Sequence, residues 1–150
     1  MQKHVKFGLM LTVSTVIMFA ATYLNVYEPS HIFFSQTRAF MALLMGAIMA
    51  VFILAFMRGM YPSRAANIAI FCASGLVFVV ALWLVRSQQT VDDVSWMKAM
   101  IPHHSIAILT SERTCISDPR VRKLADGIIE TQRREIAEME RLLKDPRDPN

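Results

Sequence analysis

The chain has 150 residues, of which 54% are hydrophobic, with a mean hydropathy of +0.37 and a formal net charge of +4. This composition is too apolar for an ordinary soluble domain. Residues 1–86 hold six Lys and Arg against one acid, and residues 87–150 hold ten against eleven acids. The cations of the first part flank apolar segments and form no patch, which argues against nucleic-acid binding and indicates a membrane protein.

Three stretches contain no Asp, Glu, Lys or Arg: residues 7–27, 39–57 and 65–85. About 20 apolar residues cross a hydrocarbon core of roughly 30 Å, so we predict three transmembrane helices that make residues 1–86 a membrane anchor. A signal peptide is disfavoured for the first stretch, because the apolar part of such peptides is usually about 7–15 residues long and no clean small-x-small cleavage site follows.

The distribution of Lys and Arg predicts the orientation of these spans. With the N-terminus in the cytoplasm, four cations lie on the cytoplasmic side and two lie outside: Lys3, Lys6, Arg58 and Arg64 against Arg38 and Arg86. We therefore expect an integral protein of a bacterial inner membrane, with an extracytoplasmic, periplasmic C-terminal domain over residues 87–150.

Small residues repeat every four positions in the second span, at Ala42, Gly46 and Ala50. This spacing lets two helix backbones approach closely and favours association of the span with a second copy. Charged residues inside a span are the usual mark of an ion path. No span of this chain contains a carboxylate, Lys or Arg. The three spans therefore indicate an anchor.

The C-terminal part predicts a hairpin of two helices. "TVDDVSW" (residues 90–96) opens the first helix, with Thr90 as the predicted N-cap. Pro102 predicts a kink in this helix or a new start within it. "ISDPR" (residues 116–120) provides a stop and a restart, with Asp118 or Ser117 as the cap of a second helix over about residues 119–144.

An apolar stripe at helical spacing predicts the inner face of each helix. On the second helix its members are Val121, Leu124, Ala125, Ile128, Gln132, Ile136, Met139 and Leu143. Antiparallel pairing across the turn aligns His104 with the region of Gln132 to within about one helical turn. We therefore predict a polar layer of His103, His104, Gln132, Glu135 and Met139, with Met100 and Met97 next along the first helix.

Two helices with roughly 50 ordered residues between them make only a marginal core when they stand alone. We therefore expect a second copy of the chain to complete a four-helix bundle with twofold symmetry. The predicted fold class is all-α, with three transmembrane helices followed by a soluble antiparallel hairpin that is half of such a bundle.

"MKAMIPHHSIAI" followed by "LADGIIETQRREIAEM" resembles the domain-of-unknown-function 305 family, a ferritin-like group of helical domains, over about residues 91–143. The resemblance implies an extracytoplasmic helical bundle with a role in metal binding. The residues that match its pattern are Met100, His103, His104, Gln132, Glu135 and Met139. Where the family often continues A-I-x-M-A, this chain has Thr110 in place of a thioether.

Imidazole and thioether side chains together suit copper, especially the soft cuprous ion. The predicted ligands are His103, His104, Met100, Met139 and Met97, while Gln132 or Glu135 orients a ligand imidazole. The alternative is a non-catalytic structural or accessory membrane subunit, in which the histidines are hydrogen-bonded polar residues of a dimeric core. We predict no catalytic residues and no enzyme, and a di-iron centre is disfavoured because no E-x-x-H occurs. The expected partners are the lipid bilayer, a second copy and a larger membrane complex, with no nucleic acid.

Overall fold

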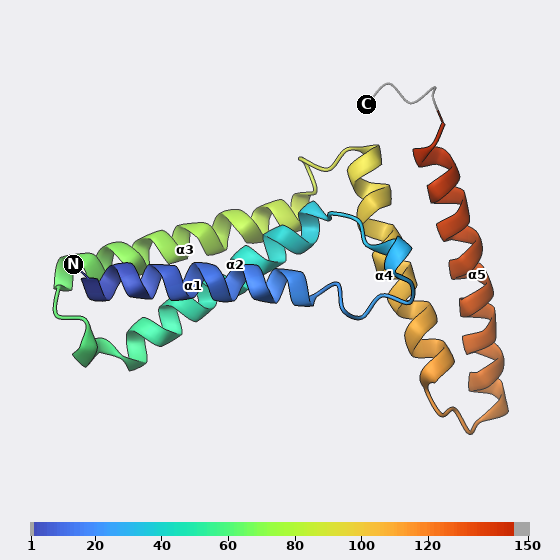
Figure 1. Ribbon diagram of the computed structural model, residues 1–150, viewed down its shortest axis with the longest axis horizontal. Coiled ribbons are helices and arrows are strands. Elements are labelled where there is room, and N and C mark those ends of the chain that lie inside the picture. The colour runs from blue at the N-terminus through green and yellow to red at the C-terminus, as the bar shows by residue number, and fades with distance from the viewer. Residues whose placement is uncertain (1, 146–150) are drawn as a thin grey trace. The chain divides into compact units, whose positions relative to one another are not determined.

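The structure is a computed structural model that describes residues 2–145 (Figure 1). Every regular element in this range is helical, which confirms the predicted all-α class. In chain order the elements are α1 (Gln2–Ala21), the short 3-10 helix η1 (Pro29–His31), α2 (Gln36–Phe56), the 3-10 helix η2 (Arg58–Met60), α3 (Arg64–Ser87), α4 (Asp93–Arg113) and α5 (Pro119–Leu143).

The chain divides into two compact units. The anchor unit comprises Met1–Thr22 and Thr37–Thr90, and the hairpin unit comprises Tyr23–Gln36 and Val91–Asn150. The segment between α1 and α2 therefore belongs to the same unit as the C-terminal helices.

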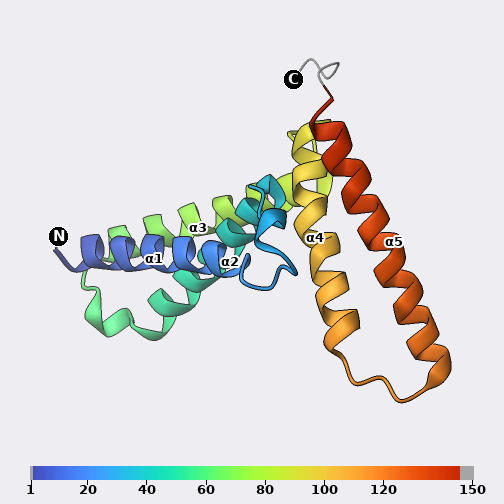
Figure 2. The same cartoon turned by 45° about the vertical axis from the view of Figure 1, so that its right-hand side comes forward.

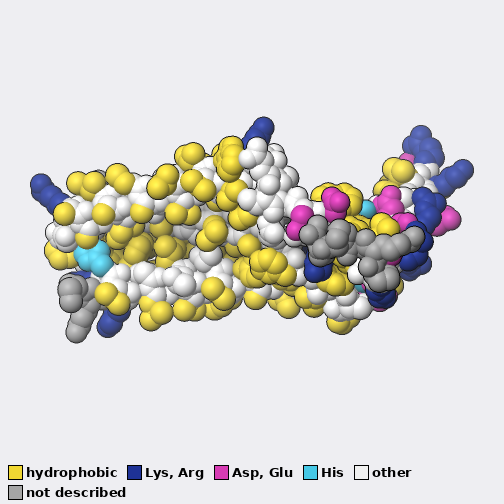
Figure 3. Space-filling model, turned by 90° about the horizontal axis from the view of Figure 1, so that it is seen from above, with side chains coloured by type: hydrophobic (Ala, Val, Ile, Leu, Met, Phe, Trp, Pro, Cys, Tyr) yellow, Lys and Arg dark blue, Asp and Glu magenta, His cyan; other side chains and the backbone are white. Residues whose placement is uncertain are grey.

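Helices α1, α2 and α3 are long and apolar enough to cross a membrane, over Lys3–Ala21, Gln36–Phe56 and Arg64–Ser87. Figure 3 shows hydrophobic side chains over most of the face that these helices present. Many large apolar side chains of this unit are exposed, including Leu9, Val16, Leu43, Phe52, Ile68 and Val79. Helices that are hydrophobic all round are typical of a lipid environment.

The close approach predicted for the second span occurs within the chain, between α2 and α1. Ala42, Gly46 and Ala50 are all buried. A Cβ atom added to Gly46 would lie 2.6 Å from the Thr15 Oγ1 atom of α1. The Thr15 hydroxyl donates to the Leu11 carbonyl at 2.8 Å and so satisfies its own donor inside this apolar contact. Only glycine leaves room for the Thr15 side chain at this position.

The first span differs from its predicted bounds of residues 7–27. Helix α1 begins before Lys3 and ends at Ala21, so Tyr27 lies in the hairpin unit rather than in the span. A run of uncharged residues marks what a bilayer tolerates, but it does not mark where the helix stops. Long cationic side chains at a helix end can reach the interface, which allows the span to include residues near Lys3 and Lys6.

Helices α4 and α5 form the predicted antiparallel hairpin and lie side by side in both views (Figures 1 and 2). The N-cap of α4 is Asp92, whose carboxylate accepts the Ser95 N–H at 2.6 Å. The prediction of Thr90 as the cap was therefore wrong, because Asp92 adds a negative charge to the positive end of the helix dipole. Of the two predicted caps of α5, Asp118 and Ser117, the structure has Asp118, which accepts the Arg120 N–H at 2.8 Å.

Helix α4 continues through Pro102, which is fully buried. The structure therefore has a single helix here and excludes a separate helix that starts at this proline. Proline cannot donate to the Lys98 carbonyl, so one backbone hydrogen bond of the helix is missing immediately before the two histidines.

The core of the hairpin unit lies between α4 and α5. It consists of Met97, Ile101 and Ile108 from α4 with Ile136 and Met139 from α5. Partly buried side chains surround it: Tyr27, Phe33, Val94, Met100, Ile129 and Leu143. Tyr27 and Phe33 come from the segment between α1 and α2, so that segment supplies one side of the core.

Three members of the stripe predicted to face inward on α5 are exposed. The exposed fractions are 47% for Val121, 65% for Leu124 and 37% for Ile128. A single neighbouring helix covers only one side of α5, so this apolar stripe is wider than the surface that α4 buries. The exposed part is available for a further helix.

Candidate functional site

The two histidines of α4 lie opposite the middle of α5. The Nδ1 atom of His104 is 3.2 Å from Oε2 of Glu135, and the Gln132 amide donates to the same oxygen at 3.4 Å. The predicted register of the hairpin thus brings His104, Gln132 and Glu135 together. The side chain of His104 is only 14% exposed, while that of Glu135 is 45% exposed.

His104 and Glu135 are close enough for an ion pair, but their atoms are not aligned for a hydrogen bond. The buried Nδ1 atom of His104 has no aligned hydrogen-bond partner among the described residues. The pKa of His104 lies below its ordinary value of 6.5, chiefly because burial disfavours the charged imidazolium. The Glu135 carboxylate opposes this shift, and the neighbouring His103 adds to it. The neutral imidazole is therefore the favoured form of His104 at pH 7.

His103 and Met100 lie beside His104 on α4. The ring centroids of His103 and His104 are 6.0 Å apart, and His103 is exposed. Met100 is half-buried and precedes the two histidines by three and four residues, a spacing that places side chains next to each other on a helix. Two imidazoles and one thioether therefore share one region of α4.

Met97 and Met139, the other two predicted ligands, have a different environment. They are 7% and 6% exposed and pack with Ile101, Ile108 and Ile136. Methionine fills apolar cores well, and that packing accounts for both residues.

A buried polar group that the sequence did not reveal lies where α4 meets the segment between α1 and α2. The Ser105 hydroxyl oxygen accepts the Tyr27 N–H at 2.6 Å and lies 2.9 Å from Nδ1 of His31. Both Ser105 and His31 are buried. In sequence, the available signal was a small polar residue between Ile101 and Ile108, which is equally typical of ordinary helix packing.

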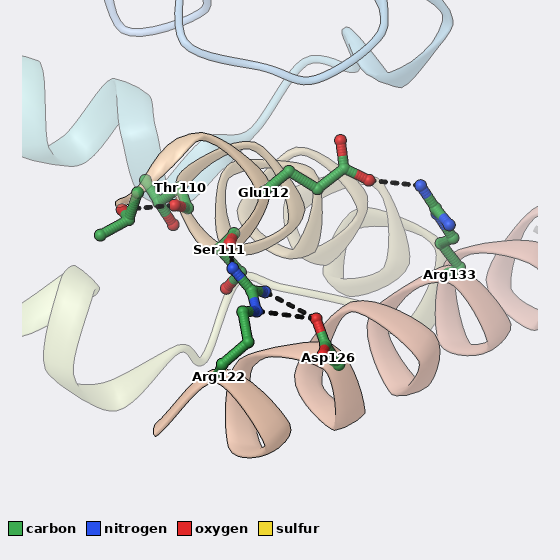
Figure 4. A network of polar contacts seen from close by, with 7 residues as sticks. Thr110, Ser111, Glu112, Arg122, Asp126 and Arg133 are labelled. Atoms are coloured by element: carbon green, nitrogen blue, oxygen red, sulfur yellow. Dashed lines mark hydrogen bonds and ion pairs between the residues drawn. The ribbon is translucent and has the colours of Figure 1, made fainter. Parts of the chain in front are cut away.

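Polar contacts also join the helices near their turn (Figure 4). The Arg122 guanidinium donates to the Ser111 carbonyl at 3.1 Å and to Asp126 at 2.9 Å. Arg133 of α5 pairs with Glu112 of α4. Exposed ion pairs of this kind contribute about 0–1 kcal/mol each, so they stabilise the register less than the core does.

In the part of the chain that the structure describes, no three His, Cys, Asp or Glu side chains gather in an arrangement that would hold a metal ion. A metal site built from one chain therefore needs a thioether or main-chain donor beside the imidazoles. Met100 is the sulfur donor nearest to the histidines in sequence.

The hairpin, with its paired histidines on α4 and its Gln132 and Glu135 on α5, can be compared with known proteins. Residues 84–150 match the family model of DUF305, a domain of unknown function. The DUF305 match spans the two helices and supports the resemblance seen over residues 91–143. An uncharacterized protein of Acanthamoeba polyphaga mimivirus is 39% identical over 71 residues, and the match covers 45% of each chain. The alignment thus spans less than half the length of this curated relative, and no solved structure matches the chain.

Proposed function

We propose that this chain is a membrane-anchored helical protein whose DUF305 hairpin binds a cuprous ion through His104, together with His103 and Met100. The observation that carries the proposal is the carboxylate of Glu135 beside Nδ1 of His104. A small rotation of the ring would let this carboxylate accept the Nδ1 hydrogen, which would orient the imidazole and leave Nε2 as the donor to a metal.

The donor set fits a soft ion. Thioether sulfur selects cuprous copper over harder cations, and imidazole binds copper well. Burial supports the same interpretation, because the low pKa of His104 keeps its imidazole neutral at pH 7, and only the neutral ring can bind a metal. A bound copper ion would supply a redox-active or transferable metal centre. The chain itself supplies the ligands and holds the His104 ring in place.

The proposal includes the surroundings of the hairpin. We place α1 to α3 in a bacterial inner membrane with the N-terminus in the cytoplasm and the hairpin outside, on the basis of the Lys and Arg distribution. A second copy would cover the exposed apolar stripe of α5 and complete a four-helix bundle. This proposed interface is supported by Leu124 and Ile128, which are both apolar and exposed in the single chain.

A second candidate function is that of an accessory membrane subunit without a metal. The observation that favours it is the placement of Met97 and Met139 in the apolar core, where packing accounts for them fully. In that case Glu135 and Gln132 are polar neighbours of His104 with no role in metal binding.

Competition for cuprous ion with a chromophoric chelator tests the two candidates on the full-length protein in detergent. We expect stoichiometric binding by the wild type. His104→Ala should abolish it, and Glu135→Gln should weaken it by about 10- to 100-fold, the usual effect of removing a group that orients a ligand.

Two methionine variants provide a matched comparison. Met100→Leu should weaken copper binding, whereas Met97→Leu conserves the volume of a core side chain and should leave binding unchanged. Helicity and particle size are measured for each variant. Failure of the folded wild type to compete for copper would reject the metal site and favour the accessory subunit.

A further inference from the structure

A groove runs along the anchor unit between its three helices, with a volume of about 470 Å³. Side chains from all three helices line it, and among them are Phe7, Leu11, Ala47, Ala50, Ile70 and Val77. Its walls are almost wholly apolar. A groove of this kind has few polar groups to hold water, which needs two to four partners at each site.

The groove follows from the close contact between α1 and α2. Gly46 lies against Thr15, and the neighbouring Ala47 and Ala50 carry side chains too small to fill the space beside this contact. The groove is open to the surroundings of the helices, so in a membrane an apolar chain can enter it and gain dispersion contacts with its walls.

One end of the groove is polar. His4 lines it, and its Nε2 atom lies 3.2 Å from the Asn67 side-chain oxygen. The Asn67 amide in turn donates to the Tyr61 carbonyl at 2.9 Å, and the rings of His4 and Tyr61 lie 5.4 Å apart. This polar cluster joins the start of α1 to the start of α3. It marks where the apolar groove ends.

The same end carries positive charge. Lys3 and Lys6 are exposed in the first turns of α1, and Arg64 is exposed at the start of α3. Figure 3 shows cationic side chains at the end of the unit where α1 begins. Residues 1–22 and 37–90 contain no Asp or Glu, so the anchor unit has no carboxylate of its own with which to neutralise these cations.

We infer that this groove binds one acyl chain of an anionic glycerophospholipid, with the lipid phosphate beside Lys3, His4 and Lys6. The apolar walls accommodate the chain, and the charge at the polar end selects a negative headgroup. Cations close to an anionic lipid surface attract it. The inference rests on the placement of the anchor unit in a membrane, and it is independent of copper.

Glycine substitutions provide the sharpest test. Gly8 lines the groove, and a Cβ atom added there meets no atom within 4 Å, so Gly8→Leu fills the groove without a clash of its first carbon. Gly75 of α3 does not line the groove, and a Cβ there also meets nothing within 4 Å. Gly75→Leu is therefore a control that adds the same side chain to the same unit.

The full-length protein in detergent is mixed with phosphatidylglycerol or with phosphatidylcholine of the same chain length, and native mass spectrometry counts the bound lipids. We expect one retained phosphatidylglycerol on the wild type and on Gly75→Leu. Gly8→Leu should weaken its retention at least about tenfold, which corresponds to about 1.4 kcal/mol. Lys3→Gln with Lys6→Gln should remove the preference over phosphatidylcholine.

Equal retention by Gly8→Leu and the wild type would overturn the groove as the lipid site. Equal affinity of the wild type for the two lipids would overturn the selection of an anionic headgroup. Carbonate extraction of cell membranes provides a separate check: release of the wild-type chain would overturn the membrane placement on which the groove depends. Copper binding is scored in a different assay, so the two proposals fail separately.

Discussion

Burial and charge act in opposite directions on His104. The imidazole is largely removed from solvent, which lowers its pKa, yet a carboxylate lies 3.2 Å from Nδ1 and favours the protonated ring. Burial has the larger effect, so the folded chain favours the neutral form. The same neutrality makes the ring a competent metal donor, because a metal and a proton compete for the same nitrogen.

The lowered pKa of His104 predicts a loss of stability in mild acid for the metal-free protein. The unfolded state binds a proton more readily than the folded state, so this residue contributes stability above about pH 6.5, and that stability is lost as the pH falls toward the folded pKa. Glu135→Gln removes the carboxylate that raises the pKa, so His104 should titrate at still lower pH. An NMR titration of the imidazole checks both statements, and a His104 pKa above 6.5 in the wild type would contradict them.

At the scale of elements, the segment between α1 and α2 is part of the hairpin unit. Tyr27 and Phe33 pack on the core, and the Tyr27 N–H and His31 meet the Ser105 hydroxyl on α4. The contact with His31 is buried and that with Tyr27 is partly buried, and so they restrain the segment more than exposed ion pairs would. Helix α4 is thus covered on one side by this segment and on another by α5.

Ser105→Ala is expected to loosen this segment. The substitution leaves the Tyr27 N–H and the His31 Nδ1 atom without their buried partner, at a cost of about 1–3 kcal/mol in the free energy of unfolding. Faster hydrogen exchange at the Tyr27 amide, together with a lower denaturation midpoint, would support the prediction. Ser111→Ala on the same helix leaves both groups paired and is the control. Unchanged exchange at Tyr27 in Ser105→Ala would show that the hydroxyl does not hold the segment.

Local sequence patterns predicted the helices well, but they did not predict contacts between residues that are far apart in the sequence. Apolar runs predicted three helices, and the cap of α5 was narrowed to Asp118 or Ser117 because capping depends only on nearby residues. The register of α4 on α5 followed from the short turn, which is why Glu135 was expected near His104. The contact of His31 with Ser105 joins residues 74 positions apart, and no local periodicity encodes such a pairing. The end of α1 at Ala21 was missed for the same reason, because tertiary contacts of the next segment decide it.

At the scale of the whole molecule, the hairpin unit buries only part of its apolar surface. Leu124 and Ile128 of α5 remain exposed, at 65% and 37%. A single pair of helices cannot cover all sides of its members, and the dimer proposed above would place a second copy on this part of α5.

Ile128→Glu should convert the proposed dimer of the full-length protein into monomers. A twofold interface would bring two added carboxylates into apolar surroundings, so the dissociation constant should rise at least about tenfold. Ala137→Glu adds the same charge at an exposed position of α5 on the side of Tyr27, and it should leave the dimer intact. Light scattering in detergent measures the mass of both. A monomeric wild type would contradict the prediction.

The division of the hairpin unit into two pieces affects how the protein is made. During synthesis Tyr23–Gln36 leaves the ribosome first, and α2 and α3 follow before α4 and α5 exist. The early piece therefore has no partner surface until the last two fifths of the chain, from Val91 onward, have been translated. A gene fragment limited to residues 84–150, the extent of the family match, encodes two helices but omits the residues that cover one side of their core.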